Sequence, residues 1–146
     1  MKDFNLYHIP IAYMIVYVIA ILATGVWLFL LSQGLGSSDI VQTLEQIAIL
    51  PEPKSLHNFI EVAAPHIFAM GTLIFVVAHF MLFSTKISKK FSLRISIVLF
   101  TVALLNIGAY LLISFGLVVS GWVKLFTLAL FVLLFLFMLG MVAFSL

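Results

Sequence analysis

The stretch IPIAYMIVYVIAILATGVWLFLLS at residues 9–32 decides the fold, because it contains no Asp, Glu, Lys or Arg. An apolar run of this length crosses the roughly 30 Å hydrocarbon core of a bilayer as one α-helix. The apolar region of a secretory signal peptide is shorter and is closed by a small-residue cleavage site, and this run has neither feature. We therefore predict a retained first transmembrane helix.

The composition extends this prediction to the whole chain. Of its 146 residues, 65% are hydrophobic and only 8% are charged, and the mean hydropathy is +1.34. No water-soluble domain of this size keeps such a balance, so lipid must be the solvent. We predict one all-α membrane domain over residues 1–146, an up-down bundle of four transmembrane helices with no soluble catalytic domain. The predicted spans are residues 9–32, 56–84, 93–119 and 122–146.

A short helix is predicted between the first two spans, over residues 39–50. Asp39 followed three residues later by Gln42 resembles a capping box, and the apolar residues after it recur at helical spacing. Such a segment is expected to lie flat at the membrane interface. Pro51 ends it, and Ser55 is placed to cap the second span. Pro65 should bend that span.

The basic residues set the expected orientation. The loop at residues 85–94 contains four of the seven Lys and Arg residues, which by the positive-inside rule makes it cytoplasmic, together with both termini. We therefore predict a protein of the cytoplasmic (inner) membrane. Trp27 and Trp122 should mark the external interface, where Lys124 is expected to snorkel toward water.

Other function classes are excluded by what the chain lacks. There is no cysteine, so disulfides, thiolate metal sites and covalent haem attachment are ruled out. The net charge is only +2, and nothing in the sequence supports binding to nucleic acid. Because so little of the chain lies outside the bilayer, the expected partners are lipid and another membrane subunit or a second copy.

The second span carries the residues best suited to chemistry. Ionisable side chains in a membrane are costly and usually functional, and His57, Glu61, His66 and His79 all lie on this one helix. At 100° per residue, His57, Glu61 and His79 fall on one narrow stripe with Phe68, Thr72 and Phe75, while His66 points away from it. The bend expected at Pro65 leaves open that His66 and His79 face one interior.

Two histidines about 20 Å apart along a span suit haem sites near the two membrane faces. His8 begins the first span at the depth expected for His79, so the two are predicted to bracket one haem iron. The Pro65-His66 pair and the spacing from His66 to His79 resemble the small four-helix membrane b-type cytochromes, although that spacing is one residue shorter than in quinol-oxidising cytochromes b. The resemblance implies bound haem b and electron exchange with quinone or a partner redox protein.

Polar stripes on other spans offer further cofactor contacts. Asn106, Tyr110 and Ser114 recur every four residues on the third span, and this face should point inward. Asn106 and Tyr110 are candidate groups for haem propionates or a quinone carbonyl, as is a comparable stripe on the first span: Tyr13, Tyr17, Ala20 and Thr24. Both stripes would equally serve to hydrogen-bond each other and tie the helices together without any ligand. The fourth span is apolar all round and is expected to face lipid or a partner subunit.

Several alternatives remain open. His66 and His79 would serve equally well to hydrogen-bond neighbouring helices without binding anything. His57 with Glu61 at i, i+4 is half of a metal site, whereas zinc needs three or four protein ligands. The whole chain also fits a non-catalytic accessory or assembly subunit, or a small proton-conducting or transport protein that uses Glu61 and the histidines as a relay.

Overall fold

The computed structural model describes residues 5–33, 35–36, 39–51, 55–84, 86–118 and 120–145, with only the backbone given for residues 5–7 and 32. The predicted span ends Val119 and Leu146 lie outside the described residues. The described part of the chain is all-helical, and four of its helices are long and apolar enough to cross a membrane. The four-span bundle with a short fifth helix is confirmed. Its helices are α1 (Asn5–Ser32), α2 (Ile40–Ile49), α3 (Leu56–Phe83), α4 (Lys89–Ser114) and α5 (Trp122–Ser145).

Side-chain caps fix the starts of three helices. Asp39 accepts a hydrogen bond from the Gln42 backbone N–H at 2.8 Å and opens α2, as predicted. Ser55 caps α3 in the same way through the backbone N–H of Asn58. Ser88 caps α4, so this helix begins at Lys89 and includes basic residues that we had placed in the loop.

The end of α4 differs from the prediction. The helix stops at Ser114 and not near residue 119, because Gly116 adopts φ +68°. The backbone N–H of Gly116 bonds the Ile113 carbonyl and that of Leu117 bonds the Leu112 carbonyl, which is the Schellman arrangement that closes helices with a left-handed glycine.

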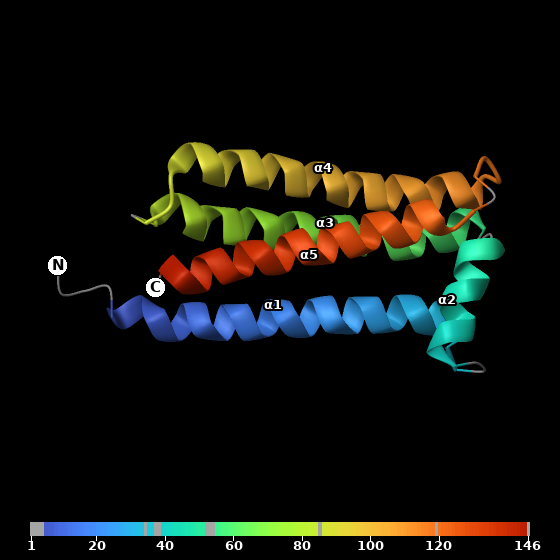
Figure 1. Ribbon diagram of the computed structural model, residues 1–146, viewed down its shortest axis with the longest axis horizontal. Coiled ribbons are helices and arrows are strands. Elements are labelled where there is room, and N and C mark those ends of the chain that lie inside the picture. The colour runs from blue at the N-terminus through green and yellow to red at the C-terminus, as the bar shows by residue number, and fades with distance from the viewer. Residues whose placement is uncertain are drawn as a thin grey trace.

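The spans run up and down, so both described ends of the chain lie at one end of the bundle, with the α3–α4 connection (Figure 1). The short helix α2 crosses the opposite end, and there it contacts α1 and α5. Thr43, Ile47 and Ala48 of α2 are buried. Trp27 and Trp122 both lie toward this α2 end and are exposed, as expected for one shared interface.

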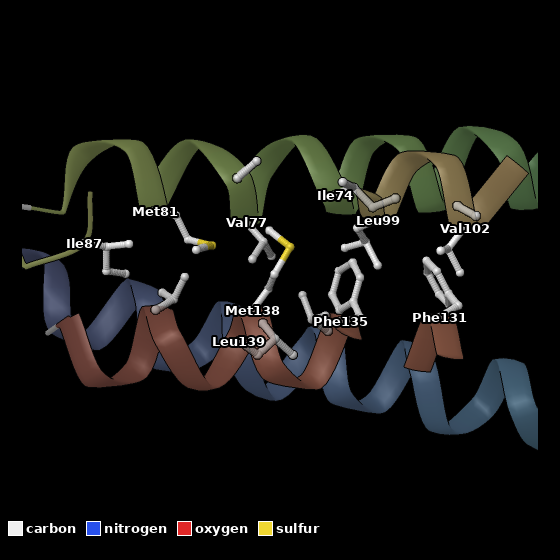
Figure 2. Close-up of a cluster of buried hydrophobic side chains, with 14 of the residues drawn as sticks. Ile74, Val77, Met81, Ile87, Leu99, Val102, Phe131, Phe135, Met138 and Leu139 are labelled. Atoms are coloured by element: carbon white, nitrogen blue, oxygen red, sulfur yellow. The ribbon is translucent and has the colours of Figure 1, made fainter. Parts of the chain in front are cut away.

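The core lies between α3, α4 and α5 (Figure 2). It is built from large apolar side chains with 0 or 1% exposure, namely Ile74, Val77, Met81, Leu99, Phe131, Phe135 and Met138. Small residues let α4 approach closely, as in other membrane bundles. Among them, Ser96 donates a hydrogen bond to the Ser92 carbonyl at 2.7 Å and so satisfies its own buried hydroxyl.

The position of α5 corrects the sequence prediction. We expected this apolar helix to face lipid or a partner, but it packs against all four other helices, with Phe131 and Phe135 in the core. In a bilayer, hydropathy does not distinguish a buried face from a lipid-facing one, because both are apolar. The outlying helix is α1, with 6% of its most apolar window buried against 22 to 33% for the other spans.

Candidate functional site

The ionisable stripe of α3 forms as predicted but faces outward. Its members are all exposed, whereas the opposite face of the helix supplies Ile74, Val77 and Met81 to the core. The stripe therefore lies on the outer surface of the bundle, where lipid or another protein would contact it. We call this surface the α3 stripe: His57, Glu61, Phe68, Thr72, Phe75 and His79.

His79 lies near the end of the α3 stripe, between two aromatic rings of its own helix. The centre of its ring is 4.7 Å from that of Phe75 and 5.6 Å from that of Phe83. Phe75 is 57% exposed and Phe83 is 73% exposed, so this group of rings projects away from the core. A ligand would reach the imidazole from outside the single chain.

His66 lies on a different side of α3 and is half-buried. Its Nδ1 atom is 2.9 Å from the carbonyl oxygen of Val62, so its own helix occupies one ring nitrogen. His66 and His79 thus do not face one common interior, and the arrangement that a bend at Pro65 would have allowed is not formed. The α3 helix continues through Pro65 from Leu56 to Phe83.

His8 lies in the first turn of α1, and the start of α1 is at the same end of the bundle as the end of α3 (Figure 1). His8 and His79 therefore lie near the same end of the bundle, as predicted. However, α1 packs mainly on α5 and α2, while the ring of His79 points outward. In the described part of the chain, no three His, Cys, Asp or Glu side chains come close enough to hold a metal ion. Haem ligation by His8, His66 and His79 stays a prediction.

The pair at the other end of the α3 stripe does form. His57 Nε2 lies 3.4 Å from Glu61 Oε1, with 82% and 65% of the two side chains exposed. This is the predicted half of a metal site, and within the described residues it remains two ligands. His57 and His79 are 22 positions apart, about 33 Å along the helix, so the two histidines lie near opposite ends of the α3 stripe.

A second polar site, which the sequence analysis did not find, lies inside the bundle near α2. Lys124 turns inward, and its ammonium donates hydrogen bonds to the Asn106 side-chain oxygen at 2.8 Å and to the Asn106 carbonyl at 3.1 Å. The same Nζ atom lies 5.5 Å from the ring centre of Phe29 and 5.4 Å from that of Tyr110. Carbonyl oxygens and aromatic faces are the neutral groups that stabilise a cation away from water. The expected snorkelling of Lys124 is therefore wrong.

We call this group, Phe29, Asn106, Tyr110 and Lys124, the Lys124 cluster. It confirms that the Asn106 face of α4 points inward, since Asn106 is 2% exposed. The cluster borders a cavity of about 10 Å³, which α2 covers through Ile47. That volume has room for about one water molecule, so the cluster packs α1, α4 and α5 against one another.

A family model described as a transmembrane helical domain, Aq_1264_TM, matches residues 29–146. The chain belongs to this family. Comparison with curated proteins and with solved structures gives no match. Nothing in the family description points to a b-type cytochrome, so that resemblance remains a hypothesis.

The matched part of this transmembrane helical domain begins at Phe29. It therefore contains the whole Lys124 cluster, the α3 stripe and the three core helices, and it leaves out His8 and most of α1. The matched residues thus hold most of the hydrophobic core, to which α1 adds Ile11 and Val18.

Proposed function

We propose that the chain is a non-catalytic accessory subunit of a larger membrane complex, and that the outer face of α1 binds a transmembrane helix of another subunit. One observation carries the proposal. A helix with the length and hydropathy of a full span has only 6% of its most apolar window buried, and more than half of its described side chains are exposed, which leaves a broad outer face of the helix for contacts outside the chain.

The exposed face of α1 has the chemistry of a helix-packing surface. Tyr13 and Tyr17 are 66% and 69% exposed, and Ala20 and Thr24 continue the same face. Small residues allow close approach of a neighbouring backbone, and hydroxyl groups hydrogen-bond across helices in membranes. A face directed only at acyl chains gains nothing from a phenol hydroxyl near the middle of a span, where Tyr17 lies. We therefore infer that the partner helix presents carbonyl, hydroxyl or amide groups at the depth of Tyr17.

Site-specific photo-cross-linking in native membranes tests this proposal. A photoreactive phenylalanine derivative at Tyr17 should give one discrete protein product in high yield, and Tyr13→Ala in the same chain should reduce that yield. The matched control places the probe at Phe126, which is 67% exposed on α5. A product at twice the chain mass of 16.3 kDa would identify a second copy and contradict the accessory role. Lipid adducts alone would contradict any protein partner.

Haem b binding is a second proposal, which the exposure of His79 restricts to a haem held outside the single chain. Since Val77 and Met81 fill the core side of α3, a haem would contact His79 from outside, between α3 and a partner helix. The test is the reduced-minus-oxidised absorption spectrum of the complex purified with its partner. A b-type α band that His79→Ala removes and His66→Ala leaves unchanged would support it. A colourless complex would exclude it without affecting the accessory role.

A further inference from the structure

Charge is distributed unevenly between the two ends of the bundle. Lys86, Lys89, Lys90 and Arg94 are all exposed at the end that holds the α3–α4 connection. The carboxylates among the described residues, those of Asp39, Glu45 and Glu61, belong to α2 and to the start of α3, at the opposite end (Figure 1). The basic end therefore has no described acidic side chain nearby to neutralise it.

The four basic residues do not have equal freedom to bind a ligand. Lys86 donates a hydrogen bond from Nζ to the carbonyl oxygen of Phe144 at 3.3 Å, which ties the connection to the end of α5. In the described part of the chain, the side chains of Lys89, Lys90 and Arg94 form no hydrogen bond or ion pair. Their charges are available to an anion from outside the protein.

Two of these charges stand above a continuous apolar surface on one face of α4. Lys90 and Arg94 are one turn apart, and the exposed residues below them on that face are Ile97, Thr101 and Leu105. The opposite face of α4, with Leu99 and Val102, is buried in the core. At 26 residues, α4 is about 39 Å long and exceeds a hydrocarbon layer of about 30 Å. Its first turns therefore reach the depth of the lipid head groups.

We propose that this face of α4 binds an anionic phospholipid. The phosphate lies between the Lys90 ammonium and the Arg94 guanidinium, and the acyl chains run along Ile97, Thr101 and Leu105. The guanidinium suits a phosphate because its parallel N–H groups bond two oxygens at once. Basic side chains at the membrane surface also attract anionic head groups through charge alone, but this site differs in combining a head-group contact with a tail contact on one helix face.

Lipid titration of the purified full-length chain in neutral detergent, followed by native mass spectrometry, tests the proposal. The probes are dioleoyl phosphatidylglycerol and dioleoyl phosphatidylcholine. We expect one phosphatidylglycerol to bind preferentially, and Lys90→Gln or Arg94→Gln to weaken its binding on the order of fivefold each. The matched control, Lys86→Gln, removes the same charge from a residue off this face and should change the affinity less than twofold. The thermal midpoint of each variant checks that the fold is retained.

Three outcomes would overturn the proposal. Equal loss of affinity in Lys86→Gln and Lys90→Gln would mean diffuse attraction and no site on α4. Equal binding of the two lipids would mean that the phosphatidylglycerol head group is not recognised. Competition by millimolar inorganic phosphate would mean a simple anion site in which the acyl chains play no part.

Discussion

The Lys124 ammonium and the Asn106 side chain form a hydrogen bond of 2.8 Å that joins α5 to α4 inside the bundle. Asn106 also receives a longer contact of 3.5 Å from the Thr127 hydroxyl, at the same oxygen. A charged donor in a dry site makes a stronger bond than a neutral one, because little water competes for it. This pair therefore fixes the relative position of the two helices near α2.

Replacing Asn106 by leucine should destabilise the bundle, because it leaves the Lys124 ammonium with the backbone carbonyl and the aromatic faces alone. Losing a hydrogen bond to a charged group costs about 1.5–3 kcal/mol. The measurement is the free energy of unfolding in detergent, followed by circular dichroism.

A double-mutant cycle provides the control for this pair. Lys124→Met removes the charge itself, so in the Lys124→Met background the Asn106→Leu change should cost much less than in the wild type. Additive losses in the double variant would show that the two side chains are not energetically coupled.

The length of the helices could be predicted from the sequence, but the Lys124 cluster could not. Hydropathy and the caps at Asp39 and Ser55 indicated all five helices, because these signals are local. The cluster depends on where α4 ends. The sequence predicts that this helix ends near residue 119, which is 13 residues or about 20 Å beyond Asn106. The helix ends instead at Ser114, so Asn106 lies about 12 Å from the helix end, near the level of Lys124.

The outward direction of the α3 stripe was also beyond the sequence. The period of a helix shows which residues share a face, and this prediction was correct for His57, Glu61 and His79. It does not show which face the other helices cover, since apolar residues surround the whole circumference of a span. From the sequence alone, a bend at Pro65 leaves open that His66 and His79 face one interior, where intramembrane ionisable groups usually point.

The turn at Gly116 should tolerate no side chain without cost. Its φ of +68° is a left-handed conformation, so Gly116→Ala should lower the free energy of unfolding by about 1–2 kcal/mol. The matched control is Gly108→Ala inside α4, where an added Cβ meets no atom within 4 Å and helix propensity favours alanine. Equal destabilisation of the two variants, measured by thermal unfolding, would contradict the role of the positive φ.

The contact between α2 and the start of α5 depends on Gly121. A Cβ atom at this position would overlap the carbonyl oxygen of Ile47, and the Gly121 N–H and the Ser120 hydroxyl both bond the Ala48 carbonyl at 3.2 Å. Gly121→Ala should therefore displace α2 and expose residues 40–51 to limited proteolysis.

The control for this contact is Gly140→Ala, at a helical position on α5 with open space around it. Its cleavage pattern should match the wild type, and its stability should be equal or greater. Unchanged proteolysis of Gly121→Ala would mean that α2 is held by its apolar face alone, through Ile47 and Ala48.

The central position of α5 predicts a large difference between two of its phenylalanines. Phe135 is 0% exposed in the core, whereas Phe126 is 67% exposed. Phe135→Ala opens a cavity, and the loss should lie near the lower end of the ~3–5 kcal/mol seen in soluble cores. The loss is at the lower end because moving a side chain from lipid into the protein interior adds no hydrophobic stabilisation, so Phe135→Ala loses only packing contacts. Phe126→Ala should change the free energy of unfolding by less than about 0.5 kcal/mol, as is usual for surface positions. Similar losses at the two positions would mean that α5 faces lipid on both sides, as its composition alone had suggested.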